Sequence, residues 1–299
     1  MTYPTFKSLL AGAAMLATAT IGTGAMAEAI VVGGKNFTEQ QLLSEITVQL
    51  LAANGLEVDN RSGMGSAALR TAMESGQVDV YWEYTGTSLI TYNKIEEKLD
   101  ADATYAKVKE LDAEKEIVWL DASKANNTYA LAMRRADAEE KGIATLSDLA
   151  ARVTEAGDLK LGSNAEFYAR PDGLKPLEEA YGFEFGRDNV VRMDSGLVYQ
   201  ALKDGQVDVG LVFATDGRIP AFDFVTLADD KGYFPAYALA PVVRAPILEA
   251  HPEIGELLNA VSAKLDDQVM SSLNARVDVD KETIEAVATS FLTENGLVN

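Results

Sequence analysis

The chain has 299 residues with 46 acidic and 26 basic side chains, which gives it a formal charge of −20. Such a surface repels nucleic acids and anionic membranes, so neither is an expected partner. The absence of cysteine excludes disulfides, thiol catalysis and zinc–thiolate sites, and a single histidine, His251, argues against a Ser-His-Asp triad or a multi-histidine metal site.

The N-terminus has the pattern of a cleaved secretory signal peptide over residues 1–27. Lys7 precedes an apolar run, which ends at the Ala-Met-Ala exit formed by Ala25–Ala27. The alternative is an N-terminal membrane anchor, but the run is short and rich in alanine and glycine. A mature chain that begins at Glu28 would lose Lys7 and become slightly more acidic still. Because no cysteine can carry a lipid anchor, we expect the mature chain to be free in its compartment.

The first part of the mature chain predicts an alternation of strands and helices. The apolar run over residues 29–34 ends in Gly-Gly, as a buried strand does before a turn. Thr38 and Gln41 have the spacing of a capping box and predict the start of a helix. Further elements are expected over residues 57–60 (strand), 67–73 (helix) and 78–81 (strand). This alternation is typical of an α/β fold with a parallel sheet.

The chain nearly repeats itself at one fixed offset, which is the separation of Met64 from Met193. The segment Met64–Val80 returns as Met193–Val209 with eight of seventeen positions identical, including all of Gly-Gln-Val-Asp-Val. The same offset carries Val-Val-Gly-Gly-Lys-Asn (31–36) onto Lys-Leu-Gly-Ser-Asn-Ala (160–165). Two blocks in register at one offset predict two copies of one supersecondary plan. Two similar lobes imply a cleft between them, and clefts of this kind bind small molecules.

The rest of the chain completes the second copy and then returns. Strands are expected over 159–162, 207–213, 226–228 and 237–243, a helix over 174–181, an extended crossover over 126–132, and a helical tail from Glu249. Because the helical tail follows the second copy, we expect at least one lobe to be discontinuous in sequence.

Aromatic and cationic side chains lie at the predicted strand ends and crossovers, and the strand ends are where ligands bind in open α/β sheets. The residues at these places are Lys35, Asn36, Tyr84, Thr85, Thr87, Tyr129, Arg170, Phe213 and Tyr237. Of these, Asn36 and Thr85 are given no contact with a ligand, and the other seven form the expected site. Tyr84 and Phe213 are separated by the offset of the repeat and therefore occupy equivalent positions in the two copies, which would let them face each other across the cleft.

The side chains of this set form two groups, which suit the two ends of one kind of ligand. A quaternary ammonium has no N–H to donate, so the ring faces of the four aromatic residues are suited to hold it. Lys35, Arg170 and the Thr87 hydroxyl can hold a carboxylate, and arginine can do so through two parallel hydrogen bonds. A ligand with both ends is a trimethylammonium carboxylate. The alternatives are that each ring packs in a core and that each cation is a solvated surface charge.

Six motifs carry a resemblance to a known family. They are, in chain order, Gly34–Gln40 (GKNFTEQ), Asp79–Thr87 (DVYWEYTGT), Asn126–Ala132 (NNTYALA), Arg170–Leu174 (RPDGL), Phe213–Gly217 (FATDG) and Asp229–Arg244 (DDKGYFPAYALAPVVR). The mature chain resembles the periplasmic glycine betaine/choline-binding proteins of ABC importers, an osmoprotectant-uptake family. The resemblance covers nearly the whole mature chain.

The resemblance implies a type II periplasmic binding-protein fold, with two α/β lobes joined by two crossover segments. Lobe 1 is then expected to be discontinuous, with residues 28–128 plus 236–299, and lobe 2 to hold residues 129–235. The motifs imply an aromatic box of Tyr84, Tyr129, Phe213 and Tyr237, a carboxylate site of Lys35, Thr87 and Arg170, and a backbone contact at Asn127. Phe213 departs from the family pattern, which often has tyrosine there, and this puts affinity and ligand choice in question.

The expected function is therefore capture of a quaternary ammonium compound by lobe closure and its delivery to a membrane permease with an ATPase. Lys35 and Arg170 favour glycine betaine over choline as the ligand. We expect a monomer without a cofactor or metal that is not an enzyme, and the chain has no nucleotide-binding motif. Two alternatives remain open: a receptor for another zwitterion, such as an amino acid or an opine, and an enzyme or metal carrier on the same fold.

Overall fold

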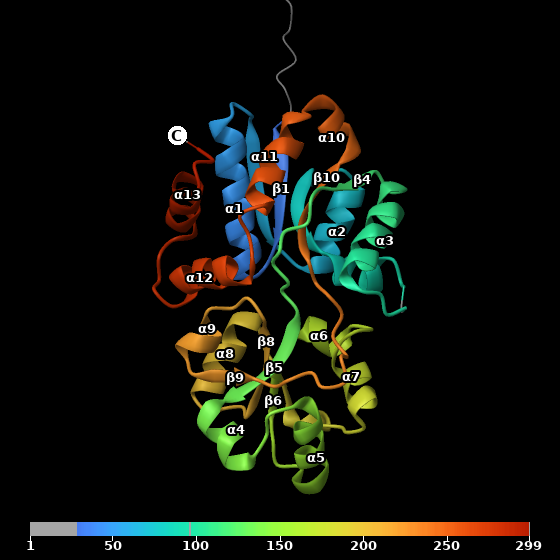
Figure 1. Cartoon of the computed structure of the whole chain (residues 1–299), viewed down its shortest axis with the longest axis vertical. Coiled ribbons are helices and arrows are strands. Elements are labelled where there is room, and N and C mark those ends of the chain that lie inside the picture. The colour runs from blue at the N-terminus through green and yellow to red at the C-terminus, as the bar shows by residue number, and fades with distance from the viewer. Residues whose placement is uncertain (1–28, 96, 299) are drawn as a thin grey trace, which may run out of the picture.

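The computed structural model describes residues 29–95 and 97–298, so the predicted signal peptide lies outside the described residues. Two five-stranded mixed sheets, each flanked by helices, form two lobes (Figure 1). The upper lobe of Figure 1 is built on the strand order β2-β1-β3-β10-β4, and the lower lobe on β7-β6-β8-β5-β9. This is the α/β architecture of two lobes that the sequence predicts.

The upper lobe combines the first part of the chain with its C-terminal part. Its strands are β1 (Ile30–Lys35), β2 (Val58–Met64), β3 (Val80–Tyr84), β4 (Ile117–Trp119) and β10 (Leu239–Arg244). Its helices are α1 (Thr38–Ala53), α2 (Ser66–Glu74), η1 (Thr87–Tyr92), α3 (Ala101–Ala113), α10 (Ala245–Ala250), α11 (Glu253–Ser262), α12 (Asp267–Asp278) and α13 (Ile284–Glu294). Strands β1, β2 and β3 are parallel, whereas β10 runs antiparallel to β3 and β4.

The lower lobe holds the middle of the chain. Its strands are β5 (Tyr129–Arg134), β6 (Leu161–Ser163), β7 (Val190–Arg192), β8 (Val209–Phe213) and β9 (Phe224–Thr226). Its helices are α4 (Arg135–Lys141), α5 (Leu146–Ala156), α6 (Ala165–Ala169), α7 (Leu174–Tyr181), η2 (Arg187–Asn189), α8 (Ser195–Lys203) and α9 (Arg218–Ala221). Here β6, β7 and β8 are parallel, and β5 runs antiparallel to β8 and β9.

The sequence repeat corresponds to a structural repeat. The first and last residues of α2, shifted by the offset of the repeat, are the first and last residues of α8. The same holds for β3 and β8. The repeated glycines have the same packing role. A Cβ on Gly33 would lie 2.8 Å from Val78 Cγ1, and a Cβ on Gly162 would lie 3.1 Å from Val207 Cγ2. Each glycine therefore lets its strand, β1 or β6, pack closely against the valine that follows the repeated helix, Val78 or Val207.

The start of α1 differs from its prediction. Phe37 is the N-cap residue and gives no side-chain cap, and the helix begins at Thr38. The predicted capping box is wrong because the Thr38 hydroxyl donates to Asp278 Oδ1 of α12 at 2.8 Å instead. The Thr38 side chain therefore bonds to Asp278, which lies 240 positions further along the chain, and not to the backbone of its own helix.

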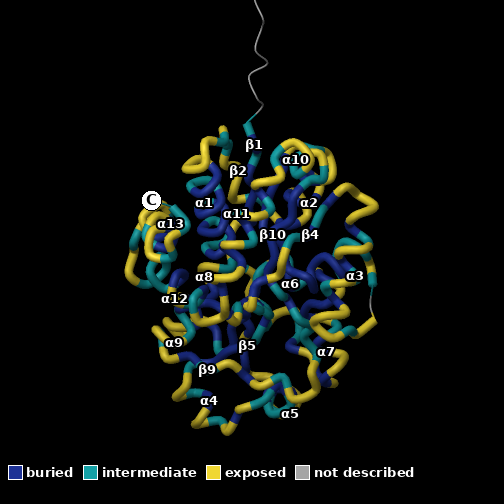
Figure 2. The backbone as a smooth tube through the Cα atoms, turned by 45° about the horizontal axis from the view of Figure 1, so that its top comes forward, coloured by how far each residue is buried: buried dark blue, intermediate teal, exposed yellow. Residues whose placement is uncertain are grey.

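Two crossover segments join the lobes, one before β5 and one after β9 (Figure 1). They run side by side: the Asn127 backbone N–H donates to the Tyr237 carbonyl at 3.2 Å, and the Tyr237 N–H donates to Asn126 Oδ1 at 2.7 Å. Figure 2 places the buried backbone through the centre of both lobes and along the junction between them. The residue boundaries proposed above for the two lobes remain a prediction.

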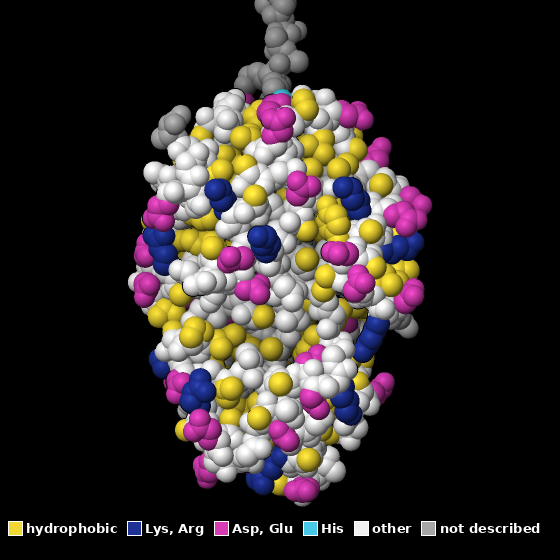
Figure 3. All heavy atoms as spheres, in the orientation of Figure 1, with side chains coloured by type: hydrophobic (Ala, Val, Ile, Leu, Met, Phe, Trp, Pro, Cys, Tyr) yellow, Lys and Arg dark blue, Asp and Glu magenta, His cyan; other side chains and the backbone are white. Residues whose placement is uncertain are grey.

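Charged side chains of both signs are scattered over both lobes on the face seen in Figure 3. Within residues 29–95 and 97–298, no helix has the length and apolar character needed to cross a membrane.

A buried ion pair organises the upper lobe around Asp112 on α3. Its carboxylate accepts hydrogen bonds from Arg70 (2.6 and 3.0 Å), Ser88 (2.8 Å), Asn93 (3.0 Å) and Trp119 (2.8 Å). Burial by itself raises the pKa of Asp112, but the hydrogen bonds and charge of Arg70 outweigh it and lower the pKa to about 2. The carboxylate therefore stays ionised inside the protein.

Replacing Asp112 with asparagine is expected to lower the free energy of unfolding by about 3 kcal/mol at pH 7, because Arg70 loses its buried partner. Urea unfolding measures the change, with Asp102→Asn, at an exposed position on the same helix, as the matched control. The pKa is depressed, so the contribution is present above the ordinary value of 3.8 and is lost as the pH falls through about 2. Equal stabilities of the two variants would contradict the prediction.

Candidate ligand-binding site

One cavity between the two lobes is lined by every predicted site residue. These are Lys35, Tyr84, Thr87, Asn127, Tyr129, Arg170, Phe213 and Tyr237. Residues that were not predicted, among them Phe37, Ser66 and Glu166, line the same cavity. The predicted residues extend from Lys35 to Tyr237 along the chain, and it is the fold that brings them together.

The strand ends place most of these side chains. Lys35 and Tyr84 end the neighbouring strands β1 and β3 of the upper sheet, and Phe213 ends β8 of the lower sheet. Tyr129 begins β5 and is paired directly with Phe213, because β5 and β8 are antiparallel. The ends of the two sheets thus meet at the cavity, as expected for open α/β sheets.

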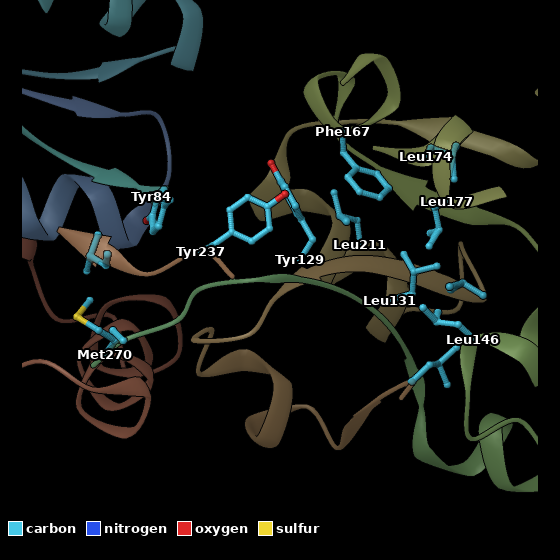
Figure 4. Packing of buried hydrophobic residues seen from close by; sticks show 14 of the residues in the cluster. Tyr84, Tyr129, Leu131, Leu146, Phe167, Leu174, Leu177, Leu211, Tyr237 and Met270 are labelled. Atoms are coloured by element: carbon cyan, nitrogen blue, oxygen red, sulfur yellow. The ribbon is translucent and has the colours of Figure 1, made fainter. Parts of the chain in front are cut away.

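The aromatic rings form a continuous series across the lobe junction. The ring of Phe37 stacks on that of Phe213, with centroids 5.2 Å apart and planes within 8°, and lies 6.3 Å from that of Tyr84. Tyr129 follows, 5.4 Å from Phe213, and Tyr237 meets Tyr129 edge-on at 5.5 Å. Figure 4 shows Tyr237 between Tyr84 on the upper lobe and Tyr129 on the lower lobe.

Phe37 is a site residue that the sequence analysis missed. Its ring is stacked with those of both Tyr84 and Phe213, the two residues that were expected to face each other. Phe37 follows Lys35 by two positions at the end of β1, so its place at a strand end was the signal that could have identified it. The series of aromatic faces is therefore longer than predicted, and such faces are suited to a quaternary ammonium.

The Lys35 ammonium is buried and paired within the upper lobe. Its Nζ lies 2.5 Å from Glu83 Oε1, and both side chains are almost fully buried. Glu83 also accepts hydrogen bonds from the Tyr81 hydroxyl at 3.0 Å and from the Tyr84 backbone N–H at 2.7 Å. An ammonium has three donors, so Lys35 retains capacity for a further acceptor in the cavity.

The Arg170 guanidinium is held in a fixed orientation in the lower lobe. Its Nε and Nη2 each donate to Asp172 at 2.7 Å, and its Nη1 donates to Glu166 at 3.2 Å. The Tyr237 hydroxyl also donates to Asp172 Oδ2, so a ring of the aromatic series is tied to the same ion pair. This arrangement orients the guanidinium before any ligand contacts it.

Each cation lies over an aromatic ring. Lys35 Nζ is 4.7 Å from the Tyr84 centroid, and the Arg170 guanidinium carbon is 5.4 Å from the Tyr129 centroid. The groups suited to a carboxylate are therefore adjacent to those suited to an ammonium. A short zwitterion can contact both kinds of group at once.

The two remaining predicted residues, Thr87 and Asn127, differ in their surroundings. Thr87 begins η1 and is buried at the wall of the cavity. The backbone N–H of Asn127, expected to contact the ligand, is already bonded to the Tyr237 carbonyl. The Asn127 side chain donates to Glu39 Oε1 at 2.8 Å.

Glu39 is a second residue that the sequence analysis missed, and it joins the two lobes. Its carboxylate accepts four hydrogen bonds: from Tyr84 (2.7 Å), Asn127 (2.8 Å), Thr215 (2.5 Å) and Asn274 (3.1 Å). Tyr84 belongs to the upper sheet and Thr215 follows β8 of the lower sheet. Burial raises the pKa of Glu39, and these four hydrogen bonds oppose the rise.

Among the residues that the structure describes, no group of three or more histidine, aspartate or glutamate side chains is arranged to hold a metal ion. The carboxylates at the cavity are instead engaged by lysine, arginine and hydroxyl donors.

Comparison with known proteins gives a consistent result. A family model described as the substrate-binding domain of ABC-type glycine betaine transport systems matches residues 28–294. The chain is 48% identical over 281 residues to a glycine-betaine-binding protein of Pseudomonas aeruginosa, an alignment that covers 92% of this chain and 90% of the relative. It is 34% identical to the glycine betaine-binding protein YehZ of Escherichia coli over 98% of this chain and 99% of the relative.

Solved structures agree with the sequence relatives. The apo structure of Escherichia coli YehZ aligns over 91% of this chain and all of that chain, with a TM-score of 0.67 and 34% identity. A crystal structure described as a glycine betaine/carnitine/choline ABC transporter aligns over 90% of this chain and all of that chain, with a TM-score of 0.73 and 28% identity. Lactococcal OpuAC, solved in a closed form with glycine betaine, shares the fold at a TM-score of 0.64.

Proposed function

The chain belongs to the family of substrate-binding domains of ABC-type glycine betaine transport systems, and we propose that its cavity captures a quaternary ammonium compound. Glycine betaine is the first candidate, with choline or a related betaine as further candidates. The observation that carries the proposal is that four predicted aromatic rings and two cationic side chains line one cavity.

In this proposal the two ends of the ligand contact different groups. Tyr84, Tyr129, Phe213 and Tyr237 surround the trimethylammonium, and each desolvated ring face contributes about 0.5 to 2 kcal/mol. Lys35, Thr87 and Arg170 receive the carboxylate. Phe213 offers a ring face without the hydroxyl of a tyrosine, and Phe37 adds a further face beside it.

The two cations favour a betaine over choline. Choline has a hydroxyl where glycine betaine has a carboxylate, so it has no negative charge to pair with Lys35 or Arg170 and cannot accept two parallel hydrogen bonds as a carboxylate can. The buried position of both cations supports this preference, because charge interactions are stronger away from water.

The role in transport follows from this capture step. We propose that lobes of residues 28–128 plus 236–299 and of residues 129–235 close around the ligand in the periplasm, after removal of the signal peptide. The closed protein would then deliver the ligand to a membrane permease with its ATPase. No bond of the ligand is made or broken in this scheme, so the protein is a receptor and not an enzyme.

Calorimetric titration tests the function. We expect saturable binding of glycine betaine and weaker binding of choline; carnitine and proline betaine, which also have a quaternary ammonium and a carboxylate, are titrated beside them. Glycine is the matched control ligand because it lacks only the three methyl groups; it should bind at least about tenfold more weakly, since a primary ammonium seeks hydrogen-bond acceptors and not ring faces. The absence of heat with every quaternary ammonium at millimolar concentration would contradict the proposal.

A further inference from the structure

We propose that Glu166 sets the choice between betaine and choline by competing with the ligand carboxylate for Arg170. The inference rests on the proposed function and concerns a residue of the same cavity. Glu166 lies in the first turn of α6, lines the cavity together with Lys35 and Arg170, and has a side chain that is 38% exposed.

The contacts of Glu166 are those that a bound carboxylate would have. Its Oε1 lies 3.2 Å from Arg170 Nη1, and its Oε2 accepts a hydrogen bond from the Ser66 hydroxyl at 2.9 Å. Ser66 begins α2 of the upper lobe, whereas Glu166 and Arg170 belong to the lower lobe. The Glu166 carboxylate therefore bridges the two lobes beside the cavity.

Glu166 is the exchangeable partner of Arg170. Asp172 holds Nε and Nη2 of the guanidinium, is only 5% exposed, and also accepts the Tyr237 hydroxyl. Nη1 is the nitrogen that Asp172 does not hold, and it faces Glu166. Nη1 has one further N–H, so a ligand carboxylate that binds there shares this nitrogen with the Glu166 carboxylate and lies directly beside it.

The charges around the cavity also disfavour the binding of a further carboxylate. The two cations at the cavity, Lys35 and Arg170, are paired with three carboxylates, those of Glu83, Asp172 and Glu166. A further carboxylate placed beside Glu166 is repelled by it, whereas the ammonium of any ligand is attracted. Glu166 thus weakens the binding of betaines relative to choline and narrows the preference that Lys35 and Arg170 create.

The test is Glu166→Gln, which removes the charge and keeps the length and the hydrogen-bond acceptor facing Ser66. Titration of glycine betaine and of choline should show betaine affinity rising at least about fivefold, while choline affinity stays the same or falls. The ratio of the two affinities should change by about tenfold. Glu166→Ala, which removes the side chain, should move the ratio in the same direction.

A matched control is available in Glu74→Gln. Glu74 is the i,i+4 partner of Arg70 at 2.7 Å, is 41% exposed, and lies outside the cavity. Its substitution should leave the affinity ratio within about twofold of that of the unaltered protein.

The outcomes separate this inference from the proposed function. Binding of both ligands by the unaltered protein, with a ratio that neither substitution of Glu166 changes, would overturn the inference and leave the proposed function standing. Weaker betaine binding in Glu166→Gln would overturn it as well, and would make Glu166 a supporting contact. No binding of either ligand by the unaltered protein would overturn both.

Discussion

Replacing Glu39 with alanine is expected to lower the free energy of unfolding by about 4 kcal/mol, because four buried donors lose their shared acceptor. The donors are the side chains of Tyr84, Asn127, Thr215 and Asn274. Each unsatisfied donor costs about 1 kcal/mol or more when water cannot reach it. Denaturant unfolding of the two proteins at pH 7 measures the difference.

Glu45 on the same helix provides the matched control. It is only partly buried and accepts hydrogen bonds from Gln49 and Asn60 within the upper lobe. Glu45→Ala should therefore cost less than about 1 kcal/mol. If Glu39→Ala were no more destabilising than Glu45→Ala, the cluster around Glu39 would not have the role assigned to it.

The same substitution changes the dependence of stability on pH. Because burial raises the pKa of Glu39 above the ordinary 4.5, the folded state binds the proton more tightly than the unfolded state does. The resulting stabilisation is fully present below that ordinary value and is lost as the pH rises through the raised pKa. The stability gap between the unaltered protein and Glu39→Ala should therefore widen as the pH is lowered from 7 to 5.

The second large effect concerns the ligand. Tyr84→Ala and Tyr237→Ala should each weaken the binding of the quaternary ammonium at least tenfold, or about 1.4 kcal/mol, because each removes a desolvated ring face. Tyr237→Phe keeps the ring and loses only the hydroxyl bond to Asp172, so it should retain most of the affinity. Calorimetry with glycine betaine measures all three variants.

Tyr105→Ala is the control for the loss of a ring. Tyr105 packs edge-on against Trp119 in the upper lobe, away from the cavity, so its removal should leave the affinity unchanged. Unaltered affinity in both Tyr84→Ala and Tyr237→Ala would remove the aromatic box from the proposed function.

The repeat specifies one part of the molecule that the sequence could predict, namely the elements that are equivalent in the two lobes. The equivalence of α2 with α8 and of β3 with β8 follows from identities at one fixed offset, and it places Tyr84 and Phe213 at corresponding strand ends. The two copies also share a packing constraint: a Cβ on Gly33 would lie 2.8 Å from a methyl group of Val78, and a Cβ on Gly162 would lie 3.1 Å from one of Val207. The side chains at the ends of these strands are among those that line the cavity between the lobes.

The contacts that sequence could not predict join residues far apart in the chain. Glu39 stands in a segment whose spacing suggests only a helix start, yet its partner Thr215 is 176 positions away. Glu166 meets Ser66 across 100 positions and across the lobe junction. Such pairs depend on how the two sheets are placed against each other, and no local pattern encodes that placement.

The two crossover segments have a consequence for redesign of the site. Tyr237 contacts the cavity from within one of the stretches of chain that connect the lobes, and Tyr129 begins β5 where the other stretch ends. The two stretches are hydrogen-bonded to each other at Asn127. Tyr84 and Phe213 instead stand at the ends of sheet strands. Changes at Tyr129 or Tyr237 made to suit a new ligand should therefore also alter how fast the receptor opens and releases it. Changes at Tyr84 should do so as well, because its hydroxyl donates to Glu39, which joins the two lobes.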